Sequence, residues 1–135
     1  MDYEEFIDTV ASRVGVTPDQ ATTLSRATLE TLAERLSGGE ARDLAAQLPR
    51  GLQECLRKPR EAAERFELPE FIRRVSVRAG VDIAMASDGA QAVLTTVRDA
   101  VTVGEFEDVM SQLPKEFGEI VQPLGARVGV PRGRR

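Results

Sequence analysis

The stretch Ser37-Gly-Gly-Glu-Ala-Arg-Asp-Leu-Ala-Ala-Gln-Leu-Pro49 occurs a second time, in altered form, as Thr102-Val-Gly-Glu-Phe-Glu-Asp-Val-Met-Ser-Gln-Leu-Pro114. Each copy begins with a hydroxyl residue, has glutamate three positions later and ends on Gln-Leu-Pro. Apolar residues recur at helical spacing between these points. The pattern predicts a short helix whose first turn is closed by a capping box, with a new helical start at the proline.

The repeat extends well beyond these two stretches. Residues 6–16 and 71–81 both read Phe-Ile-x-x-Val-x-x-Arg-x-Gly-Val, and the offset of 65 positions continues without a gap to the two Gln-Leu-Pro sequences. An ungapped match that keeps helix starts, helix stops and apolar positions together indicates an internal duplication.

The first copy predicts four helices in order. Residues 3–14 carry an amphipathic stripe and are followed by Gly15, a typical helix stop. Thr17 and Pro18 begin a second helix that extends to about Leu36, and Ser37 begins the third. A fourth, short helix is expected from Pro49, with Leu52, Cys55 and Leu56 buried.

The second copy predicts the same elements with two uncertain regions. Its long helix lacks the proline start, and Gly89 weakens the second turn, so either a start at Asp82 or a bend or late start near Ser87 and Asp88 fits the sequence. Residues 57–67 are highly charged and predict a solvated, partly helical connection. The chain is therefore divided into repeat 1 (3–56), a linker (57–67), repeat 2 (68–121) and a basic tail (123–135), with residues 1–122 forming a single helical domain.

Composition excludes several classes of function. The chain of 135 residues has no histidine, one cysteine and a net charge of −4. Catalytic triads built on histidine and Cys/His zinc sites are therefore absent. The four arginines and no acidic residues after position 121 leave the remainder acidic, which disfavours nucleic acid as its partner. With no long apolar segment and no paired cysteine, we expect a soluble, cytoplasmic protein without membrane contact.

The motif Gly-Glu-Ala-x-Asp followed by Gln-Leu-Pro, with its second Gln-Leu-Pro, resembles the prokaryotic domain-of-unknown-function family 2267. The resemblance covers about residues 3–121. It implies a small all-helical domain with this duplicated pattern. It carries over no catalytic residue, cofactor or ligand.

The polar residues of the repeat have both structural and functional interpretations. The structural one is favoured because a duplicated fold needs these residues twice, whereas a single active site needs one copy. Gln47 and Gln112 could bind a ligand, but each could also pair with the aspartate four positions earlier or cap a loop backbone group. The predicted structural signature comprises Gly39, Glu40, Asp43, Gln47, Leu48, Pro49, Gly104, Glu105, Asp108, Gln112, Leu113 and Pro114.

Four further features of the sequence also have both a structural and a functional interpretation. Arg13 and Arg78 each precede a stop glycine, and we expect them to stabilise helix ends, with Asp43 or Asp108 of their own repeat as partner, rather than to bind anions. Cys55 is expected to be a buried, inert thiol. Acidic clusters at helix starts are expected to reflect helix capping rather than metal binding. The tail arginines are candidates for contact with a partner: Arg127, Arg132, Arg134 and Arg135.

The predicted fold is an all-α helical bundle of two similar units of about four helices, related by pseudo-twofold symmetry and sharing one core. The alternative is two loosely linked lobes. We expect a non-enzymatic protein-interaction or regulatory module with no catalytic residue, cofactor or metal. The alternatives are nucleic-acid association through the tail and small-molecule binding between the repeats. Homo-oligomerisation is also compatible with the sequence.

Overall fold

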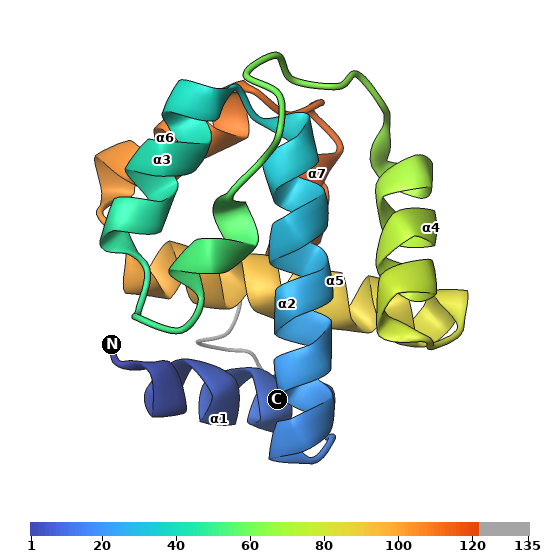
Figure 1. Ribbon diagram of the computed structural model, residues 1–135. Helices are drawn as coiled ribbons and strands as arrows, with labels where there is room; N and C mark the ends of the chain where they lie inside the picture. Colours follow the sequence, from blue (N-terminus) through green and yellow to red (C-terminus); the bar gives the residue numbers. More distant parts are fainter. Residues whose placement is uncertain (122–135) are drawn as a thin grey trace, which may run out of the picture.

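The computed structural model describes residues 1–121, and these residues are all-helical, which confirms the predicted fold class (Figure 1). The predicted tail and its arginines lie outside the described residues. The helices in chain order are α1 (Tyr3–Val14), α2 (Pro18–Arg35), α3 (Gly38–Gln47), the 3₁₀ helix η1 (Gln53–Leu56), α4 (Leu68–Ala79), α5 (Ile83–Ala100), α6 (Val103–Ser111) and α7 (Phe117–Ile120).

Local sequence signals set most helix ends. Asp2 and Thr17 cap α1 and α2 with complete capping boxes, in which Glu5 and Gln20 return the hydrogen bond. Gly15 ends α1 at a φ of 83°, a left-handed conformation that favours glycine. Gly80 ends α4 in the same way at 68°. The predicted starts and stops of the first two helices are thus confirmed.

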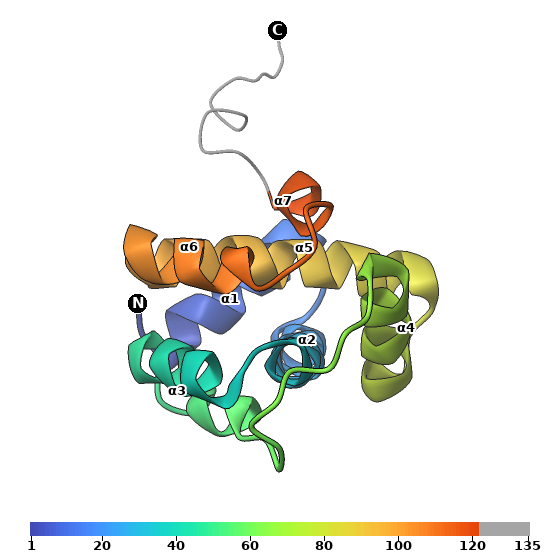
Figure 2. The same ribbon diagram turned by 90° about the horizontal axis from the view of Figure 1, so that it is seen from above.

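The two long helices, α2 and α5, cross at the centre of the molecule (Figures 1 and 2). The first helix of each half also packs on the long helix of the other half: α1 contacts α5, and α4 contacts α2. One apolar cluster includes buried side chains from both halves, with Phe6, Phe71 and Phe117 fully enclosed. Burial of the apolar stripes therefore depends on both copies being present.

One sequence prediction is wrong in detail, and the structure decides between the alternatives that the sequence left open for α5. The linker 57–67 contains no helix, because its backbone is bonded outward to the first half: Gly38 N donates to Glu61 O, and Glu64 N donates to Glu34 O, both at 2.8 Å. The helix α5 has neither a late start nor an interruption. Asp82 caps it through a 2.8 Å bond from Met85 N, and it continues to Ala100.

Gly89 in α5 is explained by packing across the helix crossing. A Cβ at this position would lie 2.7 Å from Cδ2 of Leu24 in α2. The absence of a side chain thus allows α2 and α5 to approach closely. The tertiary contact explains the glycine, whereas the sequence alone indicated only a local weakness.

Candidate functional site at the α3–α6 seam

The repeated signature places two short helices, α3 and α6, against each other (Figures 1 and 2). The hydroxyls of Ser37 and Thr102 each accept a 3.2 Å hydrogen bond from the backbone N–H three residues later, at Glu40 and Glu105. This fixes the first turn of each helix. We call the contact between these helices the α3–α6 seam, comprising Ser37, Glu40, Gln47 and their counterparts Thr102, Glu105 and Gln112.

The two glutamines of the seam cap each other's helix starts. The Ser37 N–H donates to Oε1 of Gln112 at 2.8 Å, and the Thr102 N–H donates to Oε1 of Gln47 at the same distance. Nε2 of Gln112 also donates to the Ser37 hydroxyl at 3.2 Å. These bonds are reciprocal at the offset of 65 positions. The predicted capping of a loop backbone group occurs, but across the two halves.

Because the glutamines occupy the cap N–H groups, the capping box expected in each stretch is incomplete. The side chains of Glu40 and Glu105 do not bond back to the cap residue of their own helix. Both residues are buried instead, with exposed fractions of 9% and 8%. One carboxyl oxygen of each, Oε2, is buried and receives no hydrogen bond from an N–H or O–H group of the described residues.

These two carboxyls interact directly. Burial raises the pKa of Glu40, and the hydrogen bond to Glu105 and its negative charge raise it further, to about 8. Asp108 and Asp43 act in the same direction through their charges. Because two carboxylates cannot donate to each other, that hydrogen bond requires a proton on one of them. The raised pKa of Glu40 favours its protonated form at neutral pH.

A signal for this pair was present in the sequence. Glu40 and Leu44 lie four residues apart on one face of α3, as do Glu105 and Val109 on α6, and Leu48 and Leu113 continue this spacing just beyond the helix ends. The leucines and the valine are buried. Each glutamate therefore belongs to the apolar stripe, although its position three residues after a hydroxyl favoured interpretation as a surface cap.

The remaining residues of the predicted signature are less suited to forming a functional site than the two glutamates and two glutamines. Gly39 and Gly104 have open space where a Cβ would be, so neither is required for close packing. Asp43 and Asp108 are exposed, whereas Leu48, Pro49 and Leu113 are buried and Pro114 is half-buried. The structure thus brings the two glutamates and two glutamines together and leaves the glycines outside that contact.

The prediction that Arg13 and Arg78 pair within their own repeat is wrong. Arg13 donates to Asp99 at 2.6 Å and to the Thr96 hydroxyl at 2.8 Å. Arg78 makes the corresponding bonds to Glu34 and Thr31. The exchange arises because α1 and α4 each pack on the other half's long helix. Both arginines thereby connect the halves.

Cys55 and the acidic clusters are weaker candidates for a functional site. Cys55 is buried, and its burial raises the pKa of the thiol, so it stays protonated at neutral pH and is a weak nucleophile. Within residues 1–121, no group of three histidine, cysteine, aspartate or glutamate side chains is arranged to hold a metal ion.

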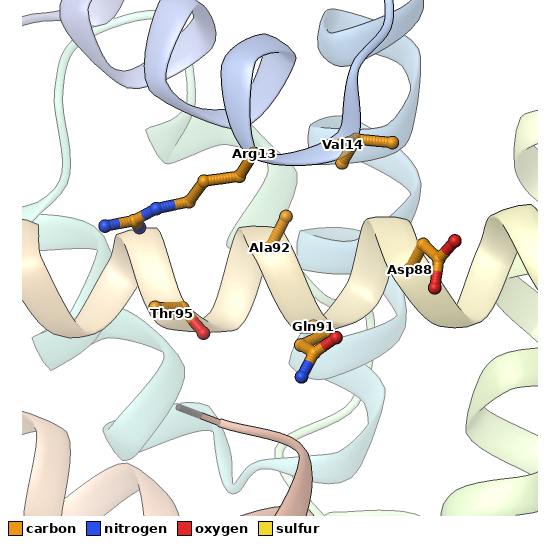
Figure 3. A pocket seen from close by; sticks show the side chains of 6 residues that line it. All are labelled: Arg13, Val14, Asp88, Gln91, Ala92 and Thr95. Atoms are coloured by element: carbon orange, nitrogen blue, oxygen red, sulfur yellow. The ribbon is translucent and has the colours of Figure 1, made fainter. Parts of the chain in front are cut away.

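A shallow depression lies between α1 and α5, where Arg13 extends over the helix that carries Asp88, Gln91, Ala92 and Thr95 (Figure 3). Arg13 is already engaged by Asp99 and Thr96. The cation that would attract an anionic ligand here is therefore part of the connection between the halves.

The fold and the seam define an all-helical protein whose repeated halves cap each other and enclose a pair of carboxyls. Residues 3–120 match the family described as "Uncharacterized conserved protein (DUF2267)", and the chain belongs to this family. The resemblance inferred from the repeated motif is thus confirmed. A search of curated proteins found no match. Over the part of the chain that is described, no helix is long and apolar enough to cross a membrane.

Proposed function

We propose that this protein is a non-enzymatic helical module that acts by binding another protein. The observation that supports the proposal is an apolar depression of about 300 Å³ where the α1–α2 and α4–α5 corners meet. We call it the corner depression. Its lining consists of Val16, Gln20, Thr23, Leu24, Ala79, Val81 and Met85.

The corner depression has the chemistry of a protein contact. None of the described residues that line it is charged, and its two polar lining residues, Gln20 and Thr23, are neutral. Ile83 lies between two lining residues in the sequence and is 53% exposed. Exposed apolar side chains beside an apolar depression are typical of surfaces that receive an anchor residue from a partner.

The charge of the chain specifies the partner further. Apart from the basic stretch after position 121, the sequence has an acidic excess. An acidic surface accelerates association with a basic one and disfavours acidic competitors. The expected ligand is therefore a segment of another protein that carries an apolar anchor flanked by lysine or arginine. This chemistry requires no catalytic group in the module.

The test compares the proteins that the wild type captures from a cell lysate with those captured by two variants, each of which gains one glutamate. Met85→Glu places a charge inside the corner depression, at the third helical position after Asp82, where glutamate suits a capping box. Val103→Glu places the same charge at an exposed site, the first position of α6. We expect to capture a protein that binds equally to the wild type and to Val103→Glu. Its binding to Met85→Glu should be at least about tenfold weaker, because a buried charge is left unpaired.

The captured protein is then purified, and its direct binding is measured at two salt concentrations after nuclease treatment. Binding that weakens with salt and persists without nucleic acid supports the proposal. Equal retention by all three proteins contradicts it. A nuclease-sensitive complex that disappears when residues 123–135 are deleted supports the nucleic-acid alternative instead. Light scattering on the protein alone identifies the case in which the partner is a second copy.

Small-molecule binding between the repeats is the second candidate, because the corner depression is lined by residues from both halves. A metabolite screen tests it by thermal stabilisation. A ligand present at 100 times its Kd adds about 2.7 kcal/mol to the free energy of unfolding. The candidate requires that Met85→Glu abolish this stabilisation and that Val103→Glu preserve it.

A further inference from the structure

The buried carboxyls of Glu40 and Glu105 are among the buried polar groups that the proposed protein-binding function leaves unexplained. They come from equivalent positions of the two repeats and meet where α3 packs on α6. A duplicated salt bridge would require opposite charges, but duplication supplied two residues of the same kind. Sharing one proton removes one of the two charges and lowers the cost of burying both carboxyls.

Within residues 1–121, neither of the two carboxyls forms an ion pair with an arginine or a lysine. Arg42 of α3 pairs with Glu61 of the linker at 2.9 Å. Arg98 of α5, the other helix against α6, lies 3.7 Å from Asp99. The 3₁₀ helix that packs on α3 contributes Glu54, which pairs with Arg26.

The charged groups that act on Glu40 are all acidic. They are Glu105 and Asp108 on α6 and Asp43 on α3 itself. Loss of the proton therefore leaves two adjacent buried carboxylates beside two further negative charges. Like charges at a buried contact repel strongly, and this repulsion acts directly between α3 and α6.

We propose that Glu40 and Glu105 form a proton-dependent contact, in which one shared proton holds α3 against α6 and its release to solvent loosens the seam. The proton-loaded state has one neutral carboxyl that donates to the other carboxylate. The proton-free state has two carboxylates that repel. The inference does not rest on the proposed protein-binding function, because the corner depression is formed by other residues.

The composition makes this proton easy to detect. With no histidine in the chain, the usual side chain that titrates between pH 5 and 8 is missing. A carboxyl with a raised pKa binds its proton more tightly in the folded than in the unfolded state. Its contribution to stability is therefore complete at low pH and declines as the pH rises through the folded-state pKa. Stability should decrease from pH 5.5 to pH 8.5.

The test measures urea unfolding of the full chain at pH 5.5 and 8.5, at constant ionic strength, with reductant and chelator present. For the wild type we expect the folded-to-unfolded ratio to fall at least about tenfold at the higher pH, the effect of one pKa unit of difference between the folded and unfolded states. Glu40→Gln should remove most of this fall, because a neutral amide can donate to Glu105 at either pH. Glu105→Gln should act likewise.

The matched control is Glu107→Gln, which neutralises an exposed glutamate on the same helix as Glu105. It should keep the wild-type fall. Hydrogen exchange at the Glu40 and Glu105 amides, corrected for its intrinsic pH dependence, locates the change. Protection of these amides should decrease at pH 8.5 in the wild type but not in Glu40→Gln.

A wild-type protein that is equally stable at both pH values overturns the proposal, and so does a Glu40→Gln or Glu105→Gln protein that keeps the full fall. If one glutamine variant fails to fold, the stability of the wild type at the two pH values and that of the other glutamine variant still test the proposal. A fall that Glu107→Gln removes to the same extent would assign the effect to general surface charge and would also contradict the shared-proton contact.

Discussion

The α3–α6 seam and the arginine cluster on α4 both gather carboxyl groups, but only the second supplies cations to them. We define the arginine cluster as Arg74 and Arg78 with Glu34, Glu64 and Glu70. Glu34 accepts hydrogen bonds from both arginines, at distances of 2.5 to 3.0 Å. Glu40 faces Glu105 instead, so chemically identical side chains meet opposite electrostatic surroundings.

The two regions consequently respond to pH in opposite directions. The hydrogen bond from Arg78 is the main reason that the pKa of Glu34 is lowered, and Arg74 acts in the same sense. At Glu70, hydrogen bonds from Arg73 and Arg74 lower the pKa to about 2. A lowered pKa gives stability that is present above the unfolded-state value and is lost on acidification. The arginine cluster therefore stabilises the fold at neutral pH, whereas the proton of the seam stabilises it more as the solution becomes mildly acidic.

The largest mutational effect is expected at Arg78. Arg78→Met removes bonds to Glu34 and to the buried Thr31 hydroxyl, and we expect a loss of about 1 to 3 kcal/mol in the free energy of unfolding at pH 7. Partial exposure of the ion pair keeps the loss toward the lower end. Thermal or urea unfolding measures it.

Arg13→Met is the matched variant at the equivalent position of the other half. Arg13 also bonds to an acidic residue and a threonine, but Asp99 lacks the second strong arginine partner that Arg74 provides to Glu34. We expect a smaller loss than for Arg78→Met. Equal losses would show that the shared carboxylate of the arginine cluster adds nothing to the pairing between the halves.

A smaller effect is expected from the glutamines of the seam. Gln112→Ala removes a cap on the Ser37 N–H and a bond to its hydroxyl, and we expect a loss of about 1 kcal/mol, as for other helix caps. Gln47→Ala removes only the bond from Thr102 N, at a more exposed site, and should cost less. Urea midpoints distinguish the two. A larger loss for Gln47→Ala would contradict the proposed difference between these caps.

The sequence predicted features that depend on neighbours along the chain. Asp2, Thr17 and Gly15 act within one helical turn, so their residue types suffice to place helix ends. The partners of Arg13 and Gln47 were not predictable in the same way. Periodicity assigns a residue to a helix face but does not specify which half supplies the helix opposite.

The candidate site illustrates the same limit. The repeat correctly directed attention to the stretch that contains Glu40, and the family membership that it implied is confirmed. The capping-box pattern nevertheless hid the burial of Glu40, because Gln112 takes the place that its carboxyl would occupy at Ser37 N. Only the packing of α3 on α6 reveals that two glutamates meet.

Carbon-13 NMR of the side-chain carboxyl groups tests the central claim most directly. Protein labelled at glutamate Cδ is titrated from pH 4 to pH 9, and the Glu40 and Glu105 signals are identified with the two glutamine variants. We predict that this pair releases its last proton with an apparent pKa near 8, well above the ordinary range of glutamate. Complete ionisation of both carboxyls below about pH 5 would contradict the shared proton.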